Sequence, residues 1–245
     1  MDDHSWNPKF VAQYLRKYLP HQGPDISRKE ALAAISLTAH TGSVDVLDAP
    51  CGFGRHALAL AAEGHRVQGV DASPAMIEKA AAQTAREQPR WLVADYRDIP
   101  LPDATFDVVI NLFTSMGFCG DEGDTRALSE FHRLLRPGGS LVIETAHRDQ
   151  FAGRPSHSTR WRQFPNDGYL LESREFELTT GWLRTEHLYL NGGTAESHVS
   201  RIRIYAVTEI TKMLTQAGFK NVDRYGGFDR SPFTADRRLV VLAKK

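Results

Sequence analysis

The sequence predicts an α/β domain, in which helices cover both faces of a mostly parallel sheet and a small antiparallel β insertion is added. Two observations lead to this prediction. Between residues 44 and 143, short apolar segments typical of buried strands alternate with segments of helical periodicity. From Tyr169 onward the apolar residues repeat with a period of two, as in the strands of an antiparallel sheet.

Size and charge are those of one ordinary globular domain. The chain has 245 residues with 30 basic and 30 acidic side chains, and this zero net charge removes the simplest electrostatic reason to bind nucleic acid or an anionic membrane. Cys51 and Cys119 are the only cysteines, so we expect neither a disulfide framework nor a metal site. A polar N-terminus and the lack of an apolar run of about 20 residues predict a cytoplasmic protein.

Two helices are expected ahead of the first strand. Apolar residues at helical spacing predict one helix from Lys9 to Tyr18. Ser27, with Glu30 three residues later, has the spacing of a capping box and predicts a second helix that ends at Ala39. Together these helices would form an N-terminal cap over residues 1–40.

The alternating core is expected over residues 41–150. Its predicted strands are Val44–Leu47, Val67–Val70, Trp91–Ala94, Phe106–Leu112 and Leu141–Ile143. Its predicted helices are Arg55–Glu63, Pro74–Arg86 and Thr125–Leu135. Residues 151–205 form the predicted insertion, with strands at Tyr169–Leu178, Trp182–Leu190 and His198–Tyr205. Residues 206–245 supply a last helix, Thr208–Ala217, and two closing strands, Asn221–Tyr225 and Arg238–Ala243.

A glycine-bearing loop follows the first predicted strand. Gly52 and Gly54 allow the backbone to turn sharply and to approach a ligand closely. Their spacing also fits the dinucleotide fingerprint, which leaves an NAD-dependent oxidoreductase open as an alternative. Asp48 argues against that alternative, because a carboxylate at the strand end would repel a pyrophosphate. It would attract an ammonium or sulfonium group, and S-adenosylmethionine carries both.

Two more acids follow the next two predicted strands. Asp71 lies 71 − 52 = 19 residues after Gly52, where an acid can bind two ribose hydroxyls. Asp95, followed by Tyr96, would lie within reach of an adenine amine. Each Asp alone could be an ordinary turn residue. Ligands of parallel sheets bind at the carboxyl ends of the strands, so three acids at successive strand ends favour a binding site.

Five motifs in order carry a resemblance to a known family. They are Asp48-Ala49-Pro50-Cys51-Gly52-Phe53-Gly54, Gly69-Val70-Asp71-Ala72-Ser73-Pro74-Ala75-Met76, Ala94-Asp95-Tyr96, Phe106-Asp107-Val108-Val109-Ile110 and Leu135-Arg136-Pro137-Gly138-Gly139. Residues 44–145 thereby resemble the class I S-adenosylmethionine-dependent methyltransferases. The resemblance implies that residues 1–245 form a single Rossmann-like methyltransferase domain, with a seven-stranded sheet in the order 3-2-1-4-5-7-6 and strand 7 antiparallel.

The resemblance also implies roles for individual residues. Gly52 and Gly54 would lie beside the amino-acid part of the cofactor, Asp71 would hold its ribose, and Asp95 its adenine amine. Met76 would pack on the adenine ring, or would be an ordinary core residue. The full expected cofactor-binding set is Asp48, Ala49, Gly52, Gly54, Asp71, Ala72, Met76, Asp95, Tyr96 and Asn111.

The methyl acceptor is expected at the end of the fourth strand, where Phe113 and Phe118 could wall it and exclude water. Asn111 is not followed by the Pro-Pro pair typical of enzymes that methylate flipped bases, so a nucleic-acid substrate is not expected. A hydroxyl or acid acceptor needs a general base, whereas a neutral amine does not. His147, which follows the fifth strand, is the first candidate base and a substrate-contacting residue, and His56 is the second.

The functional prediction is an S-adenosylmethionine-dependent methyltransferase that acts on a small molecule by in-line transfer. The alternatives are an NAD-dependent oxidoreductase and an idle cofactor-binding subunit that regulates or scaffolds a partner. Residues 151–205 are expected to roof the acceptor pocket or to build a homodimer contact. Arg154, Arg160 and Arg162 could anchor an acidic substrate or simply be solvated, and residues 225–229 could reach the pocket.

Overall fold

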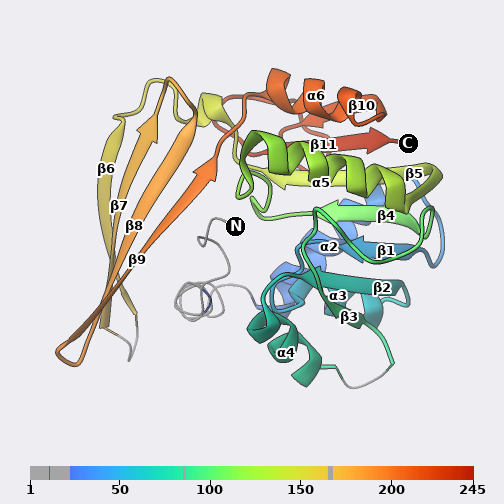
Figure 1. Ribbon diagram of the computed structural model, residues 1–245, viewed down its shortest axis with the longest axis horizontal. Coiled ribbons are helices and arrows are strands. Elements are labelled where there is room, and N and C mark those ends of the chain that lie inside the picture. The colour runs from blue at the N-terminus through green and yellow to red at the C-terminus, as the bar shows by residue number, and fades with distance from the viewer. Residues whose placement is uncertain (1–10, 12–22, 85–86, 165–167) are drawn as a thin grey trace.

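Two separate β-sheets organise the chain in the computed structural model, which describes residue 11 and residues 23–84, 87–164 and 168–245. The larger sheet has seven strands in the order β10-β11-β5-β4-β1-β2-β3, and the smaller has four in the order β6-β7-β8-β9 (Figure 1). The larger order is the predicted 3-2-1-4-5-7-6 order read from its other end. The predicted fold class is therefore confirmed.

Five parallel strands form the core of the large sheet: β1 (Asp45–Asp48), β2 (Arg66–Asp71), β3 (Arg90–Val93), β4 (Phe106–Asn111) and β5 (Leu135–Thr145). β1 lies in the middle, with Val46 aligned to Val67 of β2 and to Val108 of β4. Consecutive residues of β4, Val108 to Ile110, are fully buried, as expected for a parallel strand covered on both faces. Two antiparallel strands complete this sheet, because β11 (Leu239–Lys244) pairs with β5 and β10 (Lys220–Tyr225) pairs with β11.

Helices cover both faces of the large sheet. They are α2 (Pro24–Leu37), α3 (Arg55–Ala62), α4 (Pro74–Ala82), α5 (Gly120–Leu134) and α6 (Val207–Gln216). One apolar cluster joins Phe131 of α5 and Leu214 of α6 to Leu141 of β5, and a second joins Leu60 of α3 to Val46 of β1. None of the helices in the described ranges is long and apolar enough to cross a membrane.

Helix starts differ from the prediction in two places. α2 begins at Pro24 and not at Ser27, because the fixed φ of proline suits a first helical turn; the Ser27 hydroxyl donates to the carbonyl of Gly23. α5 begins five residues before the predicted Thr125, with Asp121 and Glu122 in its first turn. The helix predicted from Lys9 to Tyr18 falls outside the described residues apart from Val11.

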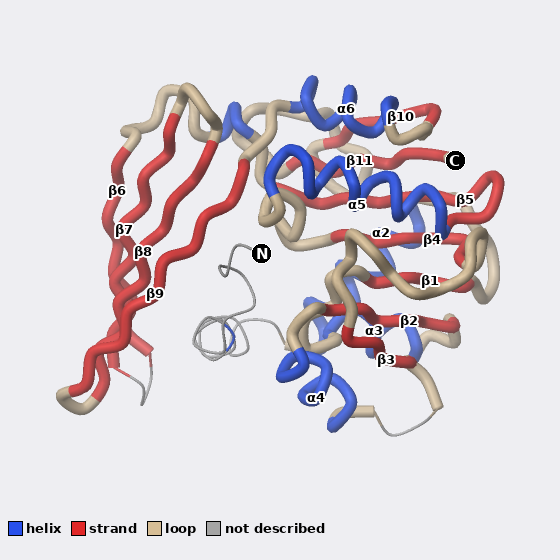
Figure 2. Tube along the Cα trace, in the orientation of Figure 1, coloured by secondary structure: helices blue, strands red, loops and turns tan. Residues whose placement is uncertain are grey.

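The small sheet is fully antiparallel and has one strand more than the prediction. Its strands are β6 (His157–Phe164), β7 (Gly168–Glu177), β8 (Trp182–Asn191) and β9 (Thr194–Arg203). β6 was missed because its sequence, HSTRWRQF, is mostly polar and lacks an apolar alternation. Figure 2 shows the small sheet standing apart from the large one, beyond the end where the parallel strands stop.

Candidate cofactor and acceptor site

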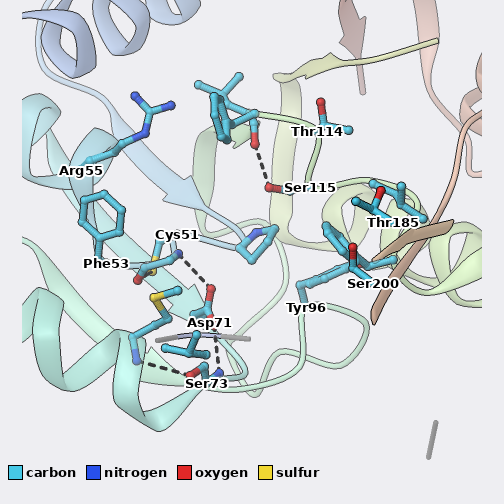
Figure 3. A pocket seen from close by; sticks show the side chains of 18 of the residues that line it. Cys51, Phe53, Arg55, Asp71, Ser73, Tyr96, Thr114, Ser115, Thr185 and Ser200 are labelled. Carbon is cyan, nitrogen blue, oxygen red and sulfur yellow. Dashed lines mark hydrogen bonds between the residues drawn. The ribbon is translucent and has the colours of Figure 1, made fainter. Parts of the chain in front are cut away.

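A cavity of about 250 Å³ lies between the carboxyl ends of the parallel strands and the inner face of the small sheet. Its lining combines three parts of the chain: the loop after β1 with the start of α3, the loop after β4, and alternate residues of β7, β8 and β9. Figure 3 shows Cys51, Phe53 and Arg55 on one side and Thr185 and Ser200 of the small sheet on the other. The same cavity thus contacts both the predicted cofactor loop and the predicted insertion.

The two glycines of the loop after β1 serve different purposes. Gly52 has φ +55° and a Cβ there would meet no atom within 4 Å, so its backbone borders open space at the cavity wall. Gly54 has φ +82°, and a Cβ there would lie 2.3 Å from the ring of Trp91. Gly52 therefore leaves room for a ligand, whereas Gly54 permits close packing of the loop against β3.

Asp71, at the end of β2, is the best-placed polar group in the cofactor half of the cavity. One carboxylate oxygen accepts the N–H of Gly52 at 2.9 Å, and the other accepts the N–H of Ser73 at 2.9 Å. Its burial raises its pKa, and these two N–H donors oppose that rise. Each carboxylate oxygen can accept a second hydrogen bond, so Asp71 can still hold a pair of hydroxyls that enter the cavity.

Asp48 and Asn111 lie at the ends of the adjacent strands β1 and β4, and both are buried without lining the cavity. Asn111 donates from Nδ2 to the carbonyl of Ala49 at 2.8 Å. Within the described residues, Oδ2 of Asp48 and Oδ1 of Asn111 have no hydrogen-bond partner. Burial raises the pKa of Asp48 to about 7, although the nearby Arg55 guanidinium lowers it. This pair of acceptors favours a cationic ligand nearby.

Asp95 and Tyr96 have different placements. Asp95 does not line the cavity, and its carboxylate accepts two hydrogen bonds at 2.9 Å from the Arg97 Nε. Burial alone would raise the pKa of Asp95, but the hydrogen bonds from Arg97 outweigh it and hold the pKa below its ordinary value. Tyr96 does line the cavity, and its hydroxyl lies 3.1 Å from Sγ of Cys119.

The expected cofactor residues thus divide into two groups. Gly52, Asp71, Met76 and Tyr96 line the cavity, whereas Asp48, Ala49, Gly54, Ala72, Asp95 and Asn111 do not. Sequence reasoning did not assign the other lining residues of this half, which include Phe53, Ser73 and Arg55. Ser73 could have been found as the N-cap of α4, because its hydroxyl accepts the N–H of Met76 at 3.4 Å.

The loop after β4 contributes apolar side chains to the cavity, because Phe113 and Phe118 both line it. Phe113 has φ +63°, a backbone conformation that is uncommon outside glycine. Its N–H donates to Glu144 at 2.8 Å, and its ring lies under the guanidinium of Arg55, 5.0 Å from the ring centroid. Glu144 also pairs with Arg238 of the closing hairpin. This loop is therefore fixed by charged groups on both sides.

His147 is not where the sequence analysis expected it. Its side chain is fully buried and does not line the cavity. Its Nε2 lies 2.8 Å from the carbonyl oxygen of Arg237, and its ring packs edge-on against Phe233, 4.7 Å between centroids. The chain after β5 turns this imidazole toward the segment that leads into β11. The predicted catalytic and substrate roles of His147 have no support in this placement.

The other candidate base, His56, does line the cavity, in the first turn of α3. Its Nε2 lies 3.0 Å from Glu30, which also pairs with Arg55. Burial lowers the pKa of His56, and Glu30 opposes that change. Arg154, Arg160, Arg162 and residues 225–229 do not line the cavity.

The wall formed by the small sheet contains the residues that sequence reasoning missed most completely. They are Arg174, Leu183, Thr185, His187, Tyr189, His198, Ser200 and Ile202. The period-two pattern predicted that such alternate residues share one face, but it did not tell which face meets the cavity. This wall borders the same cavity as Phe113 and Phe118, and Phe118 packs against Leu183 and Ile202 of the wall.

Comparison with known proteins agrees with this geometry. Residues 46–139 match the family model of the methyltransferase domain. Residues 46–139 form a methyltransferase domain. Its matched residues run from β1 to the glycine pair in β5, and they include the loop with Gly52 and Gly54 and the acid Asp71.

Relatives of this methyltransferase domain differ in what they methylate. A malonyl-[acyl-carrier protein] O-methyltransferase from Yersinia pestis is 38% identical over 106 residues, which are 43% of this chain and 38% of that protein. A glycine/sarcosine N-methyltransferase from Parasynechococcus marenigrum is 26% identical over 86% of this chain and 75% of its own length. The chain thus spans well under two thirds of the first of these relatives.

The fold of the whole chain also has a counterpart among solved structures. The CcbJ methyltransferase from Streptomyces caelestis has a TM-score of 0.84 and 22% identity, and the match covers 99% of this chain and 98% of that one. A likeness that covers both chains end to end includes the small sheet. The small sheet is therefore part of a known variant of the methyltransferase fold.

The residues of this methyltransferase domain fit S-adenosylmethionine. Asp71 offers acceptor capacity for the ribose, and the open backbone at Gly52 leaves room for the amino-acid part. The buried carboxylate of Asp48, which has an orphaned oxygen, matches the positive charge of this cofactor. Asp95 would have to exchange a hydrogen bond from Arg97 to reach an adenine amine.

Proposed function

We propose that this protein is an S-adenosylmethionine-dependent methyltransferase whose acceptor is a small molecule. The observation that supports it is a single cavity that joins the cofactor cradle at Gly52 and Asp71 to a polar wall on the small sheet. The rings of Phe113 and Phe118 line the same cavity. When bound, S-adenosylmethionine supplies a methyl group on a positively charged sulfur.

The residues of this chain would act mainly by binding, orienting and desolvating. Asp71 and the backbone around Gly52 would fix the cofactor, and Phe113 and Phe118 would exclude water from the reacting atoms. Methyl transfer is an in-line displacement, so correct positioning and water exclusion account for much of the rate. The Arg55 guanidinium, which covers the ring of Phe113, is balanced by Glu30 and adds no net charge of its own.

The small sheet supports a small acceptor over a polymer. Residues of β7, β8 and β9 close the cavity on the side that faces the loop after β4, which is where acceptors are expected. A nucleic-acid strand would need an open, positively charged groove at this position. The chain has zero net charge, and no nucleic-acid partner or membrane is part of this proposal. Location in the cytoplasm and a possible homodimer remain predictions from the sequence.

The proposal can be tested in two stages. Calorimetric titrations with S-adenosylmethionine, S-adenosylhomocysteine and NAD should show binding of the first two and none of the third. Transfer of a radiolabelled methyl group should then be measured to amino acids, amino sugars, phenols and short carboxylic acids, with bulk tRNA and denatured protein as polymer acceptors. Binding without any transfer would support an idle cofactor-binding subunit instead. Transfer to a polymer alone would contradict the small-molecule acceptor.

A further inference from the structure

We propose that His187 is the general base that takes a proton from the methyl acceptor, and that Glu172 is the residue that positions it. This inference rests on the proposed function, because it assigns chemistry to the acceptor side of the same cavity. His187 lines the cavity from β8, on the wall opposite the cofactor loop. It replaces the buried His147 as the candidate base.

The strand register brings the two residues together. Glu172 of β7 is paired directly with His187 of β8, so both side chains lie on the same face of the sheet. The same row continues on both sides, with Arg160 of β6 opposite Glu172 and His198 of β9 opposite His187. One polar row therefore crosses all four strands of the small sheet.

Glu172 is a buried anion surrounded by cationic groups. Its side chain is 2% exposed, and it pairs with the Arg160 Nε at 2.5 Å and the Arg174 guanidinium at 3.5 Å. The Nδ1 atom of His187 lies 3.4 Å from Oε1 of Glu172. Burying a carboxylate is costly unless it is paired. The two arginines supply this pairing, so Glu172 can remain ionised behind the imidazole.

An ionised carboxylate can only accept hydrogen bonds. Glu172 lies 3.4 Å from Nδ1, so it favours the neutral tautomer of His187 that carries its proton on Nδ1 and keeps the lone pair on Nε2. Nε2 lies 3.2 Å from the hydroxyl oxygen of Ser200, which also lines the cavity. The basic atom of His187 therefore points to a polar position on the cavity wall. In many enzymes a carboxylate beside one imidazole nitrogen orients the ring, so that the other nitrogen can accept a proton.

The other cavity-lining histidines are less suited to this role. His56 belongs to the cofactor side, in the first turn of α3, and contacts Glu30 through Nε2. His198 stacks on His187 with 6.1 Å between ring centroids. Its stacking can stabilise the orientation of the His187 ring.

The proposed step conserves atoms and charge. The acceptor's oxygen or nitrogen forms a bond to the methyl carbon, while the carbon–sulfur bond breaks and its electron pair stays on sulfur. The acceptor's proton moves to Nε2 of His187, which becomes a cation that faces the carboxylate of Glu172. No oxidant or further reactant is needed.

The charged and titratable groups that surround His187 come from several elements. On the small sheet they are Arg160, Glu172, Arg174 and His198, and across the cavity they are Arg55, His56 and Asp71. A pH profile alone would mix their contributions. The test must therefore observe the His187 ring directly.

Nitrogen NMR of the imidazoles, with the protein saturated by S-adenosylhomocysteine, provides that observation. The signal that disappears in His187→Gln identifies the ring. We expect it to be neutral with its proton on Nδ1 at pH 8 in the wild type and in Glu172→Asp, and to lose this preference in Glu172→Gln. Unchanged affinity for S-adenosylhomocysteine shows that each variant is folded. A proton on Nε2 in the wild type would overturn the inference.

Turnover supplies the second readout, with those amino acids, amino sugars, phenols or carboxylic acids that the wild type methylates. His187→Gln should lower kcat by about 10²-fold or more, as for loss of a general base. His157→Gln, an exposed histidine of β6, is the matched control and should keep wild-type kcat. If His187→Gln keeps more than about a third of wild-type kcat, only this inference fails. If the wild type methylates none of these acceptors, the proposed function fails with it.

Discussion

Replacing Asp48 by asparagine should stabilise the ligand-free protein, by an amount that grows as the pH rises from about 4 to about 7. The substitution keeps the shape of the side chain and removes its charge. In the folded protein burial raises the pKa of Asp48 from 3.8 to about 7. Between pH 4 and 7 the unfolded chain has already lost this proton while the folded protein keeps it, so the folded state becomes less stable as the pH rises through this range.

The size of this effect follows from the two pKa values. The pKa of Asp48 is 3.8 in the unfolded chain and about 7 in the folded protein. This difference lowers the unfolding free energy of the wild type by about 4 kcal/mol at pH 8 and by almost nothing at pH 4. Urea unfolding of the ligand-free wild type and Asp48→Asn at pH 4.5 and pH 8 measures it. Relative to the wild type, the unfolding free energy of the variant should be higher by about 2–4 kcal/mol more at pH 8 than at pH 4.5. The lower figure allows for relaxation around the site.

A matched control is Asp98→Asn, because the Asp98 side chain is 78% exposed and pairs only with an exposed arginine in the contacts described. Its effect on stability should be small at both pH values. If Asp48→Asn changes stability equally at pH 4.5 and pH 8, the buried carboxylate is not held in its protonated form, and the reasoning is refuted. The same ionisation should make S-adenosylmethionine bind more tightly as the pH rises through 7, since a cationic ligand favours the ionised form.

Four further substitutions test other parts of the site. Asp71→Ala should weaken S-adenosylmethionine binding by about 1.5–3 kcal/mol, measured by calorimetry, because charge-assisted hydrogen bonds are lost. Gly54→Ala should lower the unfolding free energy by more than about 3 kcal/mol, since its Cβ would lie 2.3 Å from Trp91, whereas Gly52→Ala, with nothing within 4 Å, should cost only about 1 kcal/mol. Similar losses for both glycines would contradict this distinction. His147→Ala should destabilise the protein by about 1–3 kcal/mol and change kcat less than threefold; a kcat loss near 10²-fold would restore its catalytic role.

The large sheet was predictable because its strands are marked by their own composition. Continuous apolar segments such as Phe106–Leu112 are typical of strands that are buried on both faces. The helices between these strands indicate that the strands are parallel. Once the strand ends were known, Asp48 and Asp71 followed as polar residues at those ends. Their local environments did not follow, because the burial of Asp48 depends on strand pairing with residues far along the chain, such as Ile110 of β4.

The direction of a single side chain beyond a strand end was not predictable. The sequence analysis placed His147 in the segment that follows β5, and the backbone does run there. Its ring, however, is held by the carbonyl of Arg237, which lies 90 residues later. Nothing in the local sequence around His147 indicates that contact.

The cavity wall on the small sheet was even harder to predict from the sequence. Its place in the site depends both on the register of its strands and on how the small sheet packs against the large one. A slip of one residue between β7 and β8 would turn His187 to the outer face of the small sheet. Even in register, the wall needs contacts that join the small sheet to the rest of the chain, and one of them anchors the end of β9 to the loop after β4. There the carbonyl of Gly117 accepts the N–H of Arg203 at 2.9 Å, and a Cβ at Gly117 would lie 2.2 Å from the Arg203 carbonyl oxygen.

The Arg203 side chain completes this joint between the two sheets. Its guanidinium pairs with Asp121 of α5 at 3.1 Å and with Glu209 of α6 at 2.6 Å, and it lies over the ring of Tyr205, 4.6 Å from the centroid. These charged contacts lie at the end of β9, outside the cavity, and help to hold the sheet that carries His187. A substitution at this joint can therefore alter methyl transfer without touching either ligand.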